Sequence, residues 1–264
     1  MRRGCAGVAQ GAGSRRALLG VAALLFAASV ALTTLQCASM SAMGGTRMAG
    51  GWAMSMAWTR MPGQSWVAAF GCFLTMWTVM TVAMMLPSLT PALLHHQARC
   101  WRFALTVRMA LGYFAVAATL GAAIYPLGAA LAVLQMHWPL LARCTPAAAG
   151  LIVVASGLVQ FTRWKSYQLA CCRHAAGRGA AHAPDALSAW RGGLRLGLRC
   201  CCCCLPQTAV LLAVGVMDLR AMAVVSGAIA AERLPARGAR LAKLTGAVAV
   251  GVGTLVLAHA AGID

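Results

Sequence analysis

The chain has 264 residues and a formal net charge of +18, but only 10% of its residues are charged and 61% are hydrophobic. Its mean hydropathy of +0.77 lies well above that of soluble domains. A soluble nucleic-acid-binding protein needs a solvated basic surface, whereas here long apolar stretches separate the basic residues. The composition therefore predicts an integral membrane protein and argues against nucleic acid as a partner.

Seven apolar runs approach the length of roughly 20 residues that crosses a bilayer. They cover residues 17–35, 66–86, 109–134, 147–162, 200–217, 221–231 and 244–261. The sixth run is short, and only a tight helical hairpin predicted at 217–220 separates it from the fifth. We expect an all-α polytopic transmembrane bundle of about seven spans, or six if the first is cleaved or two merge.

The basic residues indicate how the chain is threaded. With seven spans and a cytoplasmic N-terminus, 18 of the 22 Lys and Arg fall on the cytoplasmic side, as the positive-inside rule requires. This predicts a basic cytoplasmic N-terminus at 1–16 and one transmembrane domain at 17–264, in contact with the lipid of a bacterial inner membrane. The segment SRRALLG at 14–20 is typical of a twin-arginine export signal, but no convincing cleavage site follows, so we expect the first span to be retained.

Two longer polar stretches interrupt the apolar pattern, at 36–65 outside the membrane and 163–193 inside it. We expect both to be loops. The outer stretch belongs to a methionine-rich region whose thioethers could collect a soft ion, or which could simply form an interfacial loop anchored by Trp. Its methionines are Met40, Met43, Met48, Met54, Met56 and Met61.

Five consecutive cysteines, at 200–204, precede Pro206. On a helix, Cys200, Cys203 and Cys204 share one face within about 100°, whereas Cys202 points the opposite way. Thiolates at this spacing favour Cu(I), Zn or an iron–sulfur centre. We predict that these three sulfur atoms project into a shared pocket, while simple packing of small buried thiols between membrane helices remains the alternative.

A second pair of thiols, Cys171 and Cys172, lies among basic residues that favour the metal-binding thiolate. We include both in the predicted metal site, with incidental loop cysteines as the alternative. In the second span Met76, Met80 and Met84 recur every four residues, and Met85 follows directly. This stripe could be ordinary core packing, or it could lead a soft ion toward the cysteines.

Acidic residues are scarce, so Asp218 and Glu232, at the ends of the sixth run, form a possible polar network. For Glu232 we expect an ion pair with Arg233, Arg237 or Lys243. No catalytic constellation is evident, and we do not expect an enzyme.

Several segments together resemble a bacterial family of predicted metal-binding integral membrane proteins with no established function. They are MWTVMTVAMMLPS at 76–88, RWKSYQLACCR at 163–173, GLRCCCCC at 197–204 and GVMDLRAMAVVSGAIAAER at 215–233, within a family-like core of about 66–250.

The family pattern G-L-x-C-x-G-C-C falls on Gly197, Leu198, Cys200, Cys203 and Cys204, with Cys202 in place of the usual glycine. A second pattern, K-x-x-C-L-x-x-C-R, matches Lys165, Leu169, Cys172 and Arg173, but Gln168 replaces its first cysteine. The resemblance implies metal binding and supplies no enzyme activity.

The preferred hypothesis is an inner-membrane protein that binds a soft metal ion for transport, insertion or tolerance. Cu(I) is the favoured ion, with Zn or another transition metal as alternatives. A metallochaperone or a metalloenzyme assembly factor is the expected partner. A membrane thiol redox protein and a structural membrane subunit without metal are the competing hypotheses.

Overall fold

A computed structural model of the chain describes residues 2–42, 46–47, 53–54, 58, 60, 63–100, 103–178, 185–215, 218–233 and 238–261. Its helices are α1 (Arg2–Ala42), α2 (Trp66–Cys100), α3 (Phe103–His137), α4 (Pro139–Val159), α5 (Arg163–Arg178), α6 (Ala186–Val214), α7 (Leu219–Glu232) and α8 (Gly238–Ala260). A two-residue antiparallel ladder joins β1 (Thr46–Arg47) to β2 (Ala53–Met54). The predicted all-α class is confirmed.

Within the described residues, six helices are long and apolar enough to cross a membrane: α1, α2, α3, α4, α6 and α8. Their outward side chains are apolar, with Val67 80%, Leu127 72% and Leu255 71% exposed. Lipid offers no hydrogen-bond partners to backbone groups, and helices pair these groups internally. The apolar exterior is compatible with contact with acyl chains. The fold is that of a multi-pass membrane protein.

The predicted sixth span is the shorter helix α7. Its 14 residues rise about 21 Å, less than the roughly 30 Å of a hydrocarbon core. The chain leaves α6 at Gly215, whose φ is +135°, and Asp218 caps α7 by accepting hydrogen bonds from the backbone N–H of Arg220 and Ala221. Two helices therefore meet near the predicted hairpin, but the described residues supply six long spans rather than seven.

The predicted cytoplasmic loop at 163–193 is wrong, because most of its described residues are helical. Helix α5 begins at Arg163, and α6 begins at Ala186, 14 residues before the first cysteine of the run. Arg191, Arg195 and Arg199 lie four residues apart on α6 and are all exposed, so the charges occupy one helical face. The cysteine run consequently lies in the middle of a long helix instead of at its end.

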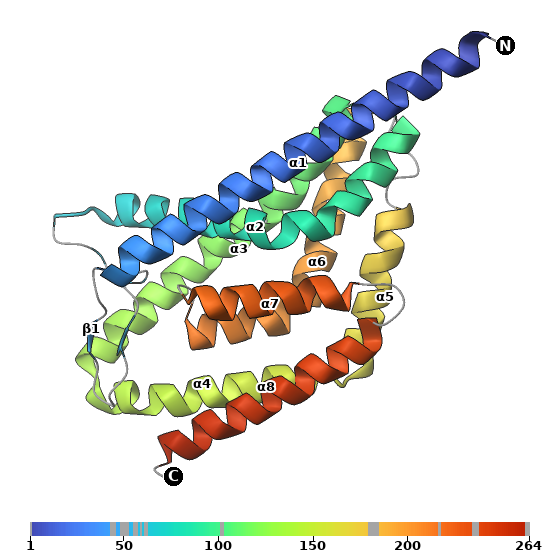
Figure 1. The fold of residues 1–264 in the computed structure, drawn as a ribbon. Helices are drawn as coiled ribbons and strands as arrows, with labels where there is room; N and C mark the ends of the chain where they lie inside the picture. Colours follow the sequence, from blue (N-terminus) through green and yellow to red (C-terminus); the bar gives the residue numbers. More distant parts are fainter. Residues whose placement is uncertain are drawn as a thin grey trace.

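Helix α6 is the central element of the bundle. It packs against α3, α4, α5 and α7, whereas α1 packs mainly on α2, and α8 mainly on α4. In Figure 1, α7 lies between the α1–α3 group and the α4–α8 pair. Side chains from the cysteine run therefore meet different helices according to the direction in which they point.

Glycines let α3 and α6 approach closely. A Cβ added to Gly193 would collide with the carbonyl oxygen of Met109, and one added to Gly197 would lie 2.9 Å from the carbonyl oxygen of Tyr113. Small residues at membrane-helix contacts allow this backbone approach. The contact brings Tyr113 against the first cysteine of the run.

Replacing Gly193 by alanine should therefore destabilise the protein by about 1–3 kcal/mol, because a backbone must move to admit the methyl group. Thermal unfolding in detergent measures the effect. Gly251→Ala is the matched control, since a Cβ there meets nothing within 4 Å. Equal melting temperatures for the two variants would contradict the close α3–α6 contact.

Candidate metal centre

The cysteine run presents its thiols as the helical wheel predicts. Cys200, Cys203 and Cys204 are 3%, 2% and 3% exposed, whereas Cys202 is exposed and Cys201 is half-buried. The three buried thiols point into the bundle, where Tyr113 of α3, Cys172 of α5 and Arg233 after α7 lie against this part of α6.

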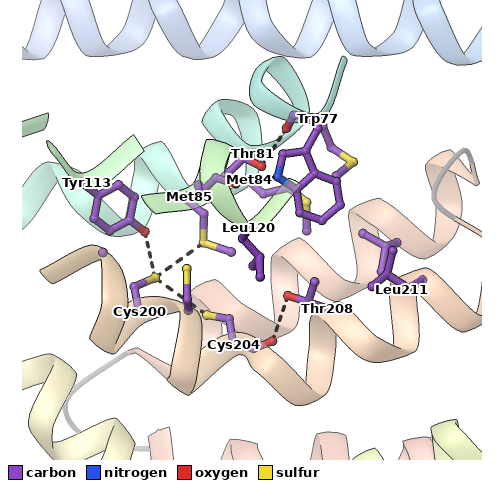
Figure 2. A pocket seen from close by; sticks show the side chains of 15 residues that line it. Trp77, Thr81, Met84, Met85, Tyr113, Leu120, Cys200, Cys204, Thr208 and Leu211 are labelled. Carbon is purple, nitrogen blue, oxygen red and sulfur yellow. Dashed lines mark hydrogen bonds between the residues drawn. The ribbon is translucent and has the colours of Figure 1, made fainter. Parts of the chain in front are cut away.

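A small cavity of about 50 Å³ lies between α2, α3 and α6. Cys200 and Cys204 border it from α6, and Met80, Met84 and Met85 border it from α2. Figure 2 shows Met85 and Cys204 directed toward Cys200, with Tyr113 on the other side of that thiol. The cavity is thus lined by soft sulfur donors and by apolar side chains such as Trp77 and Leu211.

The sulfur atom of Cys200 lies at distances from two other sulfur atoms that suit a common ion. The Sγ of Cys200 is 4.0 Å from the Sγ of Cys204 and 3.9 Å from the Sδ of Met85. Three sulfur atoms around one ion, with metal–sulfur bonds of about 2.3 Å, are separated by about 4 Å in a trigonal plane. We call Cys200, Cys204 and Met85 the sulfur cage.

A positive charge and a hydroxyl group also contact the sulfur cage. Arg233, directly after α7, donates from Nη2 to the Sγ of Cys200 at 2.6 Å and to that of Cys204 at 3.5 Å. The hydroxyl group of Tyr113 shares a hydrogen bond of 2.8 Å with the Sγ of Cys200. Arg233 places a formal charge beside two thiols that could bind a cation.

Cys203 does not border this cavity, which differs from the expectation of one pocket for three thiols. It is buried with Leu169 and Cys172 of α5, and Cys172 donates from Sγ to the carbonyl oxygen of Arg199 at 3.2 Å. Cys203 and Cys204 point about 100° apart, so α5 covers one and the α2–α3 side covers the other. We call Cys172 and Cys203 the thiol pair.

The thiol pair is not isolated from the sulfur cage, because Cys203 directly precedes Cys204 on α6 and the two side chains interact electrostatically. Sulfur atoms thus continue from Cys200 through Cys204 and Cys203 to Cys172. Cys171 does not join this series: it is half-buried, and it interacts with Tyr167, which is 67% exposed. Gln168, where the resemblance expects a cysteine, is half-buried.

Only part of the methionine stripe borders the cavity. Met80 and Met84 border the cavity, whereas Met76 is 7% exposed and packs in the core without bordering it. The predicted outer methionine side chains, from Met40 to Met61, lie outside the described residues.

The polar network that forms is centred on Glu232 and excludes Asp218, which caps the far end of α7. Glu232 pairs with Lys165 at 2.9 Å, and these side chains are 2% and 1% exposed. Gln207 and Thr245 also donate to Glu232, at 2.7 Å and 2.8 Å. The predicted partners Arg233 and Lys243 are wrong, since Lys165 of α5 is the cation that pairs with Glu232, and Arg237 lies outside the described residues.

Lys165 connects this network to the cysteine run. Its Nζ donates to the carbonyl oxygen of Cys203 at 2.8 Å and to the side-chain oxygen of Gln207 at 3.1 Å. Pro206 has no N–H to donate to the carbonyl oxygen of Cys202. The helix therefore lacks one backbone hydrogen bond next to the carbonyl group that Lys165 binds. The ion pair therefore holds α6 against α5 and α7 next to the sulfur cage.

Sequence reasoning did not single out Tyr113, named Lys165 only within the family pattern and Arg233 only as a partner of Glu232, and mentioned Met85 without assigning it to the site. Among the described residues, no three or more side chains of the His, Cys, Asp and Glu types could hold a metal ion together. His96 is buried and hydrogen-bonds with Thr106, and His95 is exposed. A site with three donors among the described residues would therefore include methionine.

The PpoB2 family, described as a copper chaperone, matches residues 74–256, which is more than half of the chain. The protein belongs to this family of copper chaperones, and six of the helices that the structure describes could span a membrane. Searches of curated proteins and of solved structures found no match.

Proposed function

We propose that the protein binds Cu(I) in the sulfur cage and passes it on within the membrane to a copper-requiring protein. The observation that carries the proposal is the convergence of Cys200, Cys204 and Met85, with sulfur separations of 3.9 and 4.0 Å beside a sulfur-lined cavity. Thiolate and thioether donors together select Cu(I) over harder ions. Membership of a copper chaperone family supports the same ion.

The thiol pair supplies a second position for the ion. A Cu(I) ion that left Cys200 and Cys204 would find the thiol of Cys203 next along the series, and then that of Cys172. Exchange between neighbouring thiolates needs only the replacement of one soft donor by another. We propose that Met80 and Met84 guide the ion into the cavity and that the thiol pair receives it.

The cellular setting follows from the same reasoning. With the N-terminus in the cytoplasm, 14 of the 18 Lys and Arg up to Arg220 fall on the cytoplasmic side whether or not α7 crosses the membrane, and this asymmetry supports an inner-membrane location. The partner is then a metalloenzyme, its assembly factor or a soluble metallochaperone that exchanges copper at the membrane. Delivery, transport and tolerance are all uses of this one binding site.

Replacement of Met85 by leucine tests the assignment of the cage. Leucine keeps the apolar volume but removes the thioether, so we expect the Kd for Cu(I) to rise roughly tenfold or more, which is about 1.4 kcal/mol. Competition with a Cu(I) chelator, on protein reconstituted in nanodiscs, measures the change. Met76→Leu is the matched control, because Met76 is equally buried but does not border the cavity.

If Met76→Leu and Met85→Leu weaken binding equally, the stripe acts only by packing and the cage is wrong. If neither variant nor wild type retains Cu(I), the proposed function fails.

A further inference from the structure

Arg233 is placed as a counter-charge for whatever ion the sulfur cage holds. Its guanidinium contacts the Sγ of Cys200 at 2.6 Å and that of Cys204 at 3.5 Å. Within the described chain, these sulfur atoms are its only side-chain hydrogen-bond partners, and its Nε lacks one. The guanidinium is therefore committed to the thiols rather than to a carboxylate.

The neighbouring carboxylate is already neutralised. Glu232 pairs with Lys165 and accepts further hydrogen bonds from Gln207 and Thr245. None of the residues that border the cavity is Asp, Glu, Lys, Arg or His. Among the described groups, Arg233 thus supplies the one formal charge that touches the cage.

The sum of the charges on the two cysteines, Arg233 and the bound ion differs between monovalent and divalent ions. Metals bind the thiolate form of cysteine, so Cys200 and Cys204 contribute two negative charges and Arg233 contributes one positive charge. A monovalent ion brings the buried sum to zero, whereas a divalent ion leaves an uncompensated positive charge. Because uncompensated charge in a low-dielectric interior is costly, the monovalent ion is favoured.

We infer that Arg233 is a specificity-determining residue that makes the sulfur cage selective for monovalent soft cations over divalent ones. This inference rests on the proposed function, because it assumes that the cage binds a metal ion. It adds a reason for selectivity that donor softness alone does not give, since thiolates also bind Zn(II) well. Arg233 acts through charge and needs no bond to the ion.

The test compares Cu(I) and Zn(II) on full-length protein in nanodiscs. For wild type and for Arg233→Gln, the Kd of each ion is measured by chelator competition, and the ratio of the Zn(II) Kd to the Cu(I) Kd is calculated. Either ion displaces the same thiol protons, so the ratio isolates the effect of ion charge. We expect Arg233→Gln to lower this ratio by roughly tenfold or more, and Arg233→Lys, which keeps the charge, to leave it unchanged.

A second variant keeps the test decisive if Arg233→Gln does not fold. Thr208 borders the same cavity, so Thr208→Asp adds one negative charge beside the cage while Arg233 is retained. It should shift the ratio in the same direction, and Thr208→Asn, its uncharged control, should not. If the wild type binds Cu(I) but the ratio is unchanged in Arg233→Gln or Thr208→Asp, the role of Arg233 in selectivity is wrong, and the proposed function still stands. A wild type that binds no Cu(I) overturns the proposed function, and this inference with it.

Discussion

The double variant Cys200→Ser/Cys204→Ser is expected to lose Cu(I) binding, with a fall in affinity of roughly 100-fold or more, about 2.8 kcal/mol. The substitution removes two of the three sulfur atoms of the cage and leaves hydroxyl groups of similar size. Hydroxyl oxygen is a hard donor that binds Cu(I) poorly. Copper analysis of purified protein, followed by chelator competition, measures the loss.

Cys202→Ser is the matched control for this variant. Cys202 belongs to the same run but is exposed on the opposite side of α6, so its replacement should leave copper affinity unchanged. Thermal unfolding of both variants without metal separates a lost ligand from a lost fold. Retention of wild-type affinity by the double variant would exclude the cage as the binding site.

The same double variant distinguishes the competing redox hypothesis. A redox pair should show a reversible loss of thiol labelling on mild oxidation, whereas a metal site should show protection that a chelator removes. Labelling of wild type before and after copper loading makes this comparison. Reversible oxidation without chelator-sensitive protection would favour thiol redox chemistry over metal binding.

Lys165→Met is expected to destabilise the fold by about 3–5 kcal/mol, because it leaves the charge of Glu232 buried and unpaired. It also removes the donor to the carbonyl oxygen of Cys203. Resistance to unfolding in detergent, measured by a denaturant or thermal series, reports the change. Lys243→Met, at an exposed position of α8, is the control and should have little effect.

A second substitution tests whether the effect arises from the ion pair. In Lys165→Met/Glu232→Leu both charges are gone, and apolar replacement of a complete buried pair is often neutral. The double variant should therefore recover a large part of the lost stability. Additive losses from the two single changes would show that Lys165 and Glu232 do not interact.

The sequence was sufficient to predict the class of fold but not all of its helices. The apolar runs correspond to the six long helices and to α7, because lipid requires continuous apolar helix. Helix α5 and the start of α6 were missed, since their basic residues made 163–193 look like a solvated loop. Hydropathy reports burial in lipid and cannot distinguish a basic helix from a basic loop.

The candidate site could be predicted only where the geometry of a single helix determines which side chains are buried. Helical periodicity correctly placed Cys200, Cys203 and Cys204 on the buried side, but it could not say which neighbouring helix each thiol would face. Cys203 faces α5, and this depends on packing between segments far apart in the chain. The contacts of Arg233 and Lys165 with the cysteine run were missed for the same reason, because they too join segments far apart in the chain.

The most direct test of the sulfur cage is x-ray absorption at the copper edge, on wild type loaded with Cu(I) in nanodiscs. We predict three sulfur neighbours at about 2.3 Å and no nitrogen or oxygen in the first coordination shell, a pattern that Met85→Leu reduces to two. A shell dominated by nitrogen or oxygen, or a spectrum that does not change in Cys200→Ser/Cys204→Ser, would contradict the account.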